Sequence, residues 1–139
     1  MKRSIHLWLV AASKTVRRGE VPTFTLTIRN EGDDPERIID LSGGRRPDLQ
    51  DSYYDLEVTQ GGKRADVPRM ISDPGPPIEQ DFLELKAGEE VAFELTRFAS
   101  GLDWLPPGKY QARVRFRQDP LAPLERDLLS PYAEFTVFE

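Results

Sequence analysis

The stretch LPPGKYQARVRF, residues 105–116, decides the fold class of this chain. From Tyr110 onward, apolar and polar residues alternate, which is typical of a β-strand with one buried face. The apolar set is Tyr110, Ala112, Val114 and Phe116. Pro-Pro-Gly directly before this set is a turn sequence. We therefore expect a strand that starts at a tight corner and packs one side against a core.

The same period of two recurs along the rest of the chain, in segments separated by turn sequences such as QGGK (60–63) and KAGEE (86–90). No segment has a convincing amphipathic helical pattern. The alternating segments are IHLWLVA (5–11), FTLTIRN (24–30), YDLEVT (54–59), FLEL (82–85), VAFELT (91–96) and AEFTV (133–137). Together they predict one all-β domain over residues 1–139, an antiparallel β-sandwich of about seven to eight strands.

The corner before the strand resembles the tyrosine corner of immunoglobulin-like sandwiches. Leu105, Pro107-Gly108 and Tyr110 carry the resemblance. In that corner, a Tyr hydroxyl at the start of a strand bonds back to the backbone of the preceding turn. The resemblance implies this structural role for Tyr110. It also implies a member of the fold without a disulfide, because Ala112 stands where antibody domains place their second Cys.

The order of segments is also similar to that of the bacterial intracellular proteinase-inhibitor family, which is itself immunoglobulin-like. The matching segments cover about a third of the chain: FTLTIRNEG (24–32), YYDLEVTQGGK (53–63), LELKAGEEVAFEL (83–95) and LPPGKYQARVRF (105–116). Proteinase inhibition is the activity that this resemblance implies. The connection over residues 40–58 is longer than in that family, with Arg45, Arg46 and Pro47 inserted.

Three arginines form an alternating row on the polar side of the strand: Arg113, Arg115 and Arg117. In immunoglobulin order this strand lies between one that carries Asp55 and Glu57 and one that carries Glu134. Opposite charges on neighbouring strands attract, so we expect the acids to neutralise the row. The chain also has a net charge of -5, which disfavours binding to polyanions. We therefore predict no nucleic-acid partner.

Composition limits the chemistry and the location of the chain. It has no cysteine, which excludes disulfides, thiolate zinc sites and a Cys nucleophile. No apolar run is long enough to predict a membrane span. Residues 1–13 have the outline of an export signal, but the apolar part is short and is interrupted by His6. We interpret it as the first strand and predict a cytoplasmic protein, with export as the alternative.

Candidate catalytic and metal-binding residues are few. His6 is the only histidine and shares a strand face with Trp8, which favours packing or exposure over a Ser-His-Asp site. The acidic turns at 31–36 and 47–51 offer oxygen ligands to calcium, but without EF-hand spacing. The sequence SGGRRPD (42–48) lacks the strand-to-helix setting of a phosphate loop. We predict a protein that is not an enzyme and has neither metal nor cofactor, with calcium in the acidic turns left open.

Two connections offer binding residues. The first, DPLAPLERDLLSP (119–131), is more apolar than a solvent loop requires, unless its leucines tuck beneath it as a satellite of the core. The second, SGGRRPDLQDSYY (42–54), carries residue types that are common at interface hot spots. The candidate partner-binding residues are Arg45, Arg46, Tyr53, Leu121, Leu124 and Leu128.

We predict a non-catalytic module that binds another protein through loops at the ends of the sandwich. A proteinase inhibitor and a carbohydrate-binding module are the alternatives. The second of these would use Trp8 or Trp104 to stack on sugar rings, although Trp104 is more easily explained as a cover for the end of the core. The oligomeric state does not follow from the sequence.

Overall fold

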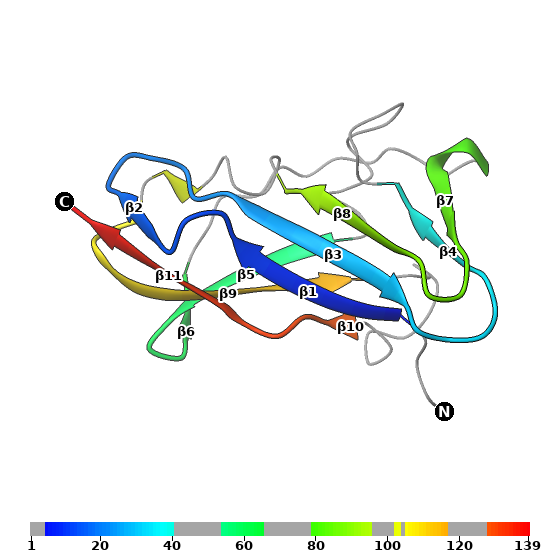
Figure 1. The fold of residues 1–139 in the computed structure, drawn as a ribbon. Coiled ribbons are helices and arrows are strands. Elements are labelled where there is room, and N and C mark those ends of the chain that lie inside the picture. Colours follow the sequence, from blue (N-terminus) through cyan, green and yellow to red (C-terminus); the bar gives the residue numbers. More distant parts are fainter. Residues whose placement is uncertain (1–4, 41–53, 66–78, 96–101, 104, 117–127) are drawn as a thin grey trace.

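The computed structural model describes residues 5–40, 54–65, 79–95, 102–103, 105–116 and 128–139 (Figure 1). In these residues the chain forms an immunoglobulin-like antiparallel β-sandwich, which confirms the predicted fold class. The smaller main sheet has three antiparallel strands in the order β1-β3-β8. Their bounds are Ile5–Ala11 for β1, Phe24–Asn30 for β3 and Glu90–Glu94 for β8.

The larger sheet has six strands, in the order β2-β11-β9-β5-β6 with β10 paired to β9. All its pairs are antiparallel except β2 with β11, which run parallel. The bounds are Thr15–Arg17 for β2, Tyr54–Gln60 for β5, Lys63–Arg64 for β6, Gly108–Phe116 for β9, Leu128–Leu129 for β10 and Ala133–Phe138 for β11. The central strand β9 therefore lies between β5 and β11, as immunoglobulin order predicted.

A third, two-stranded ladder joins β4 (Glu36–Ile39) to β7 (Phe82–Leu85), and a short 3-10 turn, η1 (Glu79–Asp81), precedes β7. Each of its strands is linked by a short turn to a strand of the three-stranded sheet: β3 leads to β4, and β7 leads to β8 (Figure 1). The ladder thus continues the β3–β8 pair beyond a break.

Side chains from the two main sheets meet in the core as the alternation predicts. Phe24, Val114 and Phe135 have exposed fractions of 1%, 0% and 2%. The ring of Phe135 on β11 contacts Phe24 of the opposite sheet edge-on at 5.5 Å and stacks on Tyr110 at 5.4 Å. Burying a side chain of this size contributes about 1.5–3 kcal/mol to stability, so these inward positions hold the two layers together.

All seven predicted strands are present, and four more are found that the sequence pattern did not predict: β2, β4, β6 and β10. Each of these is two to four residues long. A period of two cannot be recognised over so few residues. The predicted QGGK turn is confirmed as the β5–β6 hairpin, in which Gly61 and Gly62 have φ angles of 58° and 82°. Positive φ at both central residues is what a two-residue hairpin turn needs.

The tyrosine corner is confirmed. The Tyr110 hydroxyl donates a hydrogen bond of 2.6 Å to the backbone carbonyl of Pro106, and burial raises the pKa of Tyr110 above its ordinary value. The bond gives the turn before β9 a fixed attachment to the strand that follows it.

Asn30, at the end of β3, is fully buried. Its side chain forms hydrogen bonds at the break between the β3–β8 and β4–β7 pairs. Its side-chain amide donates to the carbonyls of Asp34 at 2.7 Å and Leu85 at 2.9 Å, and its side-chain oxygen accepts from the Gly32 amide at 3.0 Å. The sequence predicted only the end of a strand at this position. In the fold, Asn30 satisfies backbone groups of two separate turns.

Replacing Asn30 by Ala is expected to lower the free energy of unfolding by about 2–4 kcal/mol, because three backbone groups lose a hydrogen-bond partner, one in a buried and two in a partly buried place. Denaturant unfolding measures the change. Asp33→Ala, an exposed substitution in the same turn, is the control and should be near neutral. Equal stability of the two variants would contradict the role given to Asn30.

Replacing Tyr110 by Phe removes the corner hydrogen bond but keeps the ring in the core. We expect a loss of roughly 1–2 kcal/mol in thermal or denaturant unfolding. Tyr132→Phe is the matched control, because Tyr132 is 45% exposed. If the control loses as much stability as Tyr110→Phe, the corner does not stabilise the turn.

Candidate functional site

The outer face of the six-stranded sheet carries rows of polar side chains that run across its strands. Strand register defines two rows that we call the paired rows, Asp55 with Arg115 and Glu57 with Arg113. Two further rows, which we call the open rows, are Thr59 with Gln111 and Glu134, and Lys109 with Thr136 and Thr15. The inward neighbours on β9 are buried, so these residues face away from the core.

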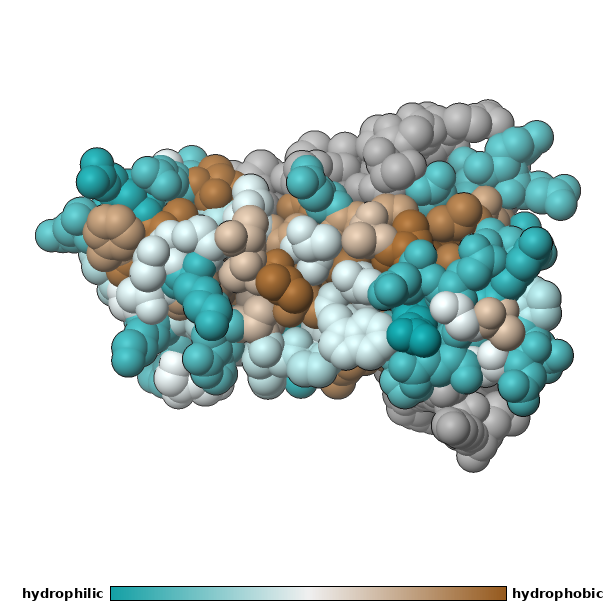
Figure 2. Space-filling model, in the orientation of Figure 1, coloured by the Kyte–Doolittle hydropathy of each residue, from teal (hydrophilic) through white to brown (hydrophobic). Residues whose placement is uncertain are grey.

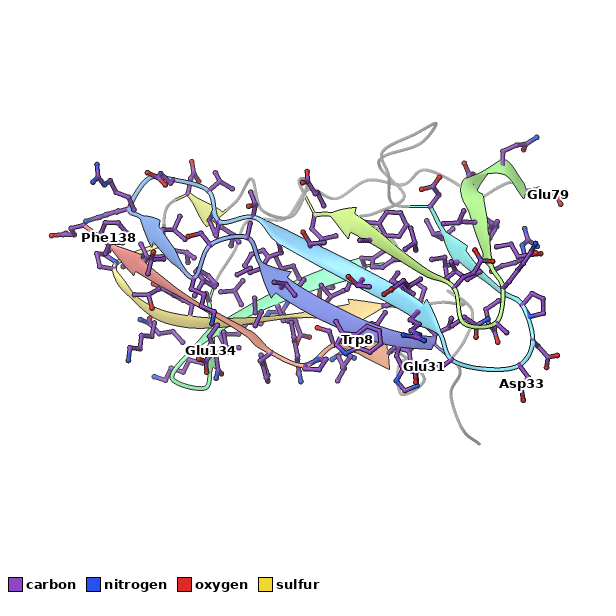
Figure 3. All side chains as sticks on the ribbon, in the orientation of Figure 1. Trp8, Glu31, Asp33, Glu79, Glu134 and Phe138 are labelled. Carbon is purple, nitrogen blue, oxygen red and sulfur yellow. The ribbon has the colours of Figure 1, made fainter. Side chains whose placement is uncertain are left out.

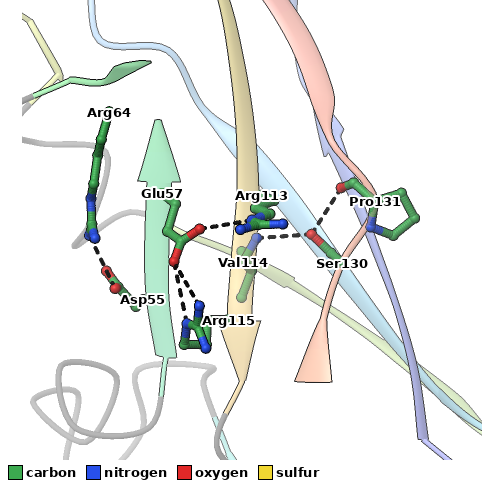
Figure 4. Close-up of polar contacts among 8 residues, drawn as sticks. All are labelled: Asp55, Glu57, Arg64, Arg113, Val114, Arg115, Ser130 and Pro131. Carbon is green, nitrogen blue, oxygen red and sulfur yellow. Dashed lines mark hydrogen bonds and ion pairs between the residues drawn. The ribbon is translucent and has the colours of Figure 1, made fainter. Parts of the chain in front are cut away.

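The paired rows are held by ion pairs (Figure 4). Glu57 accepts a 2.8 Å hydrogen bond from Nε of Arg113, and its other carboxylate oxygen lies 3.3 Å from Nε and an Nη of Arg115. On the adjacent strand pair, Arg64 lies 3.3 Å from Asp55. The predicted neutralisation of Arg113 and Arg115 from β5 is therefore confirmed for Glu57, whereas the ion pair found for Asp55 is with Arg64. Arg117 lies outside the described residues.

Burial of Glu57 would by itself raise its pKa, since its side chain is only 10% exposed. The hydrogen bonds and positive charges of Arg113 and Arg115 outweigh burial, so the pKa of Glu57 lies below its ordinary value. The same hydrogen bond raises the pKa of Arg113. Glu57 is therefore a structural anion at neutral pH, fully engaged with its two arginines.

One part of the charge prediction is wrong. Glu134 does lie on the strand next to β9, but its register partner is Gln111, and no ion pair joins it to an arginine of the described ranges. Instead, the guanidinium carbon of Arg113 lies 4.8 Å from the ring centre of Tyr132, a cation–π contact. Glu134 lies one row further along the face. The prediction failed because the register between two strands cannot be read from the sequence of either strand alone.

The open rows line a groove of about 550 Å³. The rows supply hydroxyl, amide, carboxylate and ammonium groups, and the β5–β6 turn at Gly61 and Gly62 adds backbone at one side. Lys14, just before β2, also lines the groove, as do Tyr110 and Phe135. No side-chain hydrogen bond or ion pair engages Lys14, Lys109 or Glu134 within the part of the chain that the structure describes.

The contrast between the two halves of the face makes the groove the candidate binding site. In the paired rows, charged groups bind one another. In the open rows, Thr59, Gln111 and Thr136 likewise make no side-chain hydrogen bond among the described residues, so their donors and acceptors face the groove. Sequence reasoning missed this site, although Thr59, Gln111 and Glu134 each stood on the predicted polar side of its strand.

Most of the predicted partner-binding residues cannot be compared with the groove. Arg45, Arg46, Tyr53, Leu121 and Leu124 lie outside the described residues, as does Trp104. Leu128 is described: it lies on β10 opposite Phe116 and packs, partly buried, against the core. For Leu128, this position agrees with the alternative prediction, in which leucines of the connection over residues 119–131 pack beneath the connection against the core.

The outer face of the three-stranded sheet carries Trp8, which is 39% exposed (Figure 3). Its ring stacks on His6 at 6.3 Å, and Nε2 of His6 lies 3.3 Å from the Glu31 carboxylate. Figure 2 shows this face, where hydrophilic and hydrophobic side chains are intermixed. His6 and Trp8 contact each other and are both partly exposed, in agreement with the prediction of packing or exposure for His6.

Within the residues that the structure describes, no group of three or more His, Cys, Asp or Glu is placed to hold a metal ion. Among the same residues there is no helix of the length and apolar character that crossing a membrane requires.

Replacing Glu57 by Gln should lower stability at neutral pH by roughly 1.5–3 kcal/mol, since both arginines lose a buried anion. A carboxylate with a lowered pKa stabilises the fold above its unfolded pKa, about 4.3, and that contribution is lost as pH falls through the folded value. The stability difference between wild type and Glu57→Gln should therefore shrink below about pH 4.

Urea unfolding at a series of pH values measures this difference. Glu139→Gln is the control: it removes an exposed pair with Arg18, whose side chain is 58% exposed, and should cost less than about 1 kcal/mol at any pH. A difference for Glu57→Gln that does not change between pH 7 and pH 3 would refute the electrostatic role of Glu57.

No protein family and no curated protein sequence matches the chain. Solved structures do share its fold. Spo0M, a sporulation control protein of Bacillus subtilis, superposes with a TM-score of 0.54 at 11% identity, over 98% of this chain and 50% of that one. The alkylpurine DNA glycosylase AlkC of Pseudomonas fluorescens, solved bound to DNA with an abasic site analogue, gives 0.51 at 13%, over 100% and 32%. The chain thus spans half or less of each of these structures, and at such identity the likeness extends to the fold alone.

Proposed function

We propose that this chain is a non-catalytic binding module whose ligand lies in the groove over the open rows. A single contrast on one sheet face carries the proposal. The polar groups of the paired rows bind one another, whereas those of the open rows line a groove and have no internal side-chain partner among the described residues. The volume of about 550 Å³ is within the range of about 300–1,000 Å³ that is usual for ligand sites.

The groove suits binding because strands hold its side chains. Gln111 is fixed on the central strand β9, with hydrogen-bonded neighbours β5 and β11 on both sides. Side chains on such a scaffold need little reordering when a ligand arrives, which lowers the entropic cost of binding.

The composition of the groove favours binding over catalysis. Its lining includes one carboxylate, Glu134, and no histidine, as far as the described residues go. Hydrogen bonds and charge recognition are available from this set, whereas a second carboxylate or a histidine to pair with Glu134 is not found among its described residues. A protein partner, as the sequence suggested, can reach the groove with a loop or strand of its own.

The proposal is tested by NMR. Amide signals of the labelled chain are followed while a library of short peptides and oligosaccharides is added. We expect ligands that bind to shift the signals of Thr59, Gln111 and Thr136, and Gln111→Ala to weaken their binding about threefold to tenfold through the lost hydrogen bonds.

Gln80→Ala is the matched control, because Gln80 is exposed in η1 and away from the groove. Ligands that shift only signals elsewhere, or that bind Gln111→Ala as well as wild type, would refute the site. Near-stoichiometric slowing of a subtilisin-type proteinase, unaffected by Gln111→Ala, would instead support the inhibitor function that the family resemblance implies.

A further inference from the structure

We infer that the groove takes an extended protein segment, one acidic side chain of which lies between Lys14 and Lys109. This inference rests on the proposed function and names the kind of ligand. Lys109 on β9, Thr136 on β11 and Thr15 on β2 form one row, and Lys14 directly precedes Thr15. Lys14 and Lys109 both line the groove, on opposite sides of Thr136 along this row, so a carboxylate bound above Thr136 is placed to attract both lysines.

The charge on this sheet face has the sign that an acidic ligand needs. Its described residues include five cationic side chains, namely Lys14, Arg64, Lys109, Arg113 and Arg115, and three carboxylates, namely Asp55, Glu57 and Glu134. The chain as a whole has a net charge of -5. A local positive surface on an acidic protein attracts a short acidic segment, while the remaining negative charge opposes a long polyanion.

The kind of cation points the same way. Arg64, Arg113 and Arg115 are held by acids of β5, and Arg17 on β2 lies over the Phe138 ring. The cations that line the groove itself are the lysines Lys14 and Lys109. Arginine makes bidentate contacts with carboxylate and phosphate alike, whereas a lysine ammonium is a point charge that suits a single anionic group. Two lysines therefore suit one carboxylate, and the net charge of -5 opposes a long polyanion, so an acidic peptide fits the groove better than a nucleic acid does.

The second open row sets a further requirement on the ligand. Gln111 and Glu134 lie two residues along their strands from Lys109 and Thr136, a step of about 7 Å. Side chains two apart on one side of an extended peptide have the same spacing. The residue two positions from the acid should carry a hydrogen-bond donor, such as Asn, because Glu134 accepts and Gln111 both donates and accepts.

The probe is the capped peptide acetyl-Ser-Glu-Thr-Asn-Ser-amide, titrated into the whole chain by NMR at low salt. Its counterpart with Gln in place of Glu should bind about fivefold to tenfold more weakly, the loss expected for two exposed ion pairs. Lys109→Glu should weaken the acidic peptide by at least as much. Lys86→Glu, in the β7–β8 turn, makes the same charge change away from the groove and should leave the affinity unchanged.

The outcomes separate this inference from the proposed function. Equal affinity for the Glu and Gln peptides in the groove overturns the acidic ligand but leaves the binding site. Groove signals that respond to a neutral oligosaccharide or to a single-stranded oligonucleotide, and not to the acidic peptide, overturn the ligand class alone. If no member of the set shifts a groove signal, both proposals fail.

Discussion

The packing of alternate side chains between two sheets is the constraint on which the rest of this molecule depends. Phe135 contacts Phe24 across the sandwich and Tyr110 beside it, and this fixes which side of β11 and β9 faces inward. Because side chains alternate, every neighbouring residue is thereby directed outward. A slip of one residue in either strand would bury Gln111 and Glu134 and expose the core. The groove thus exists only because the core fixes the register.

The parts of this structure that the sequence predicts are those that depend on one strand at a time. The alternation at Phe24, Val114 and Phe135 is local, and so is the corner sequence that ends in Tyr110. Neutralisation of the arginine row was also predictable, because Asp55 and Glu57 face outward at the same spacing as Arg113 and Arg115. The groove was not, because it arises from the register of four strands that are distant in the sequence. Asn30 escaped notice for a similar reason: its partner Leu85 is 55 residues away.

The two parts of the outer face of the six-stranded sheet differ in how their polar groups are used. On the six-stranded sheet, Glu57 binds two arginines and makes the centre of the face rigid, while the adjoining rows stay available to solvent and ligands. The fold itself does not select among functions, as the variety of proteins that share it shows. What distinguishes this chain is the set of side chains that β2, β5, β9 and β11 bring to one surface.

The parallel pairing of β2 with β11 has a mechanical consequence. The Thr136 amide donates to the Lys14 carbonyl at 2.8 Å, and the Arg18 amide donates to the Phe138 carbonyl at 2.6 Å. Since the strands run in the same direction, tension that draws the start of β2 away from the end of β11 loads these bonds together, in shear. A hairpin under the same pull would unzip one bond at a time. The three residues of β2 therefore oppose tension along the strands with their hydrogen bonds loaded at the same time.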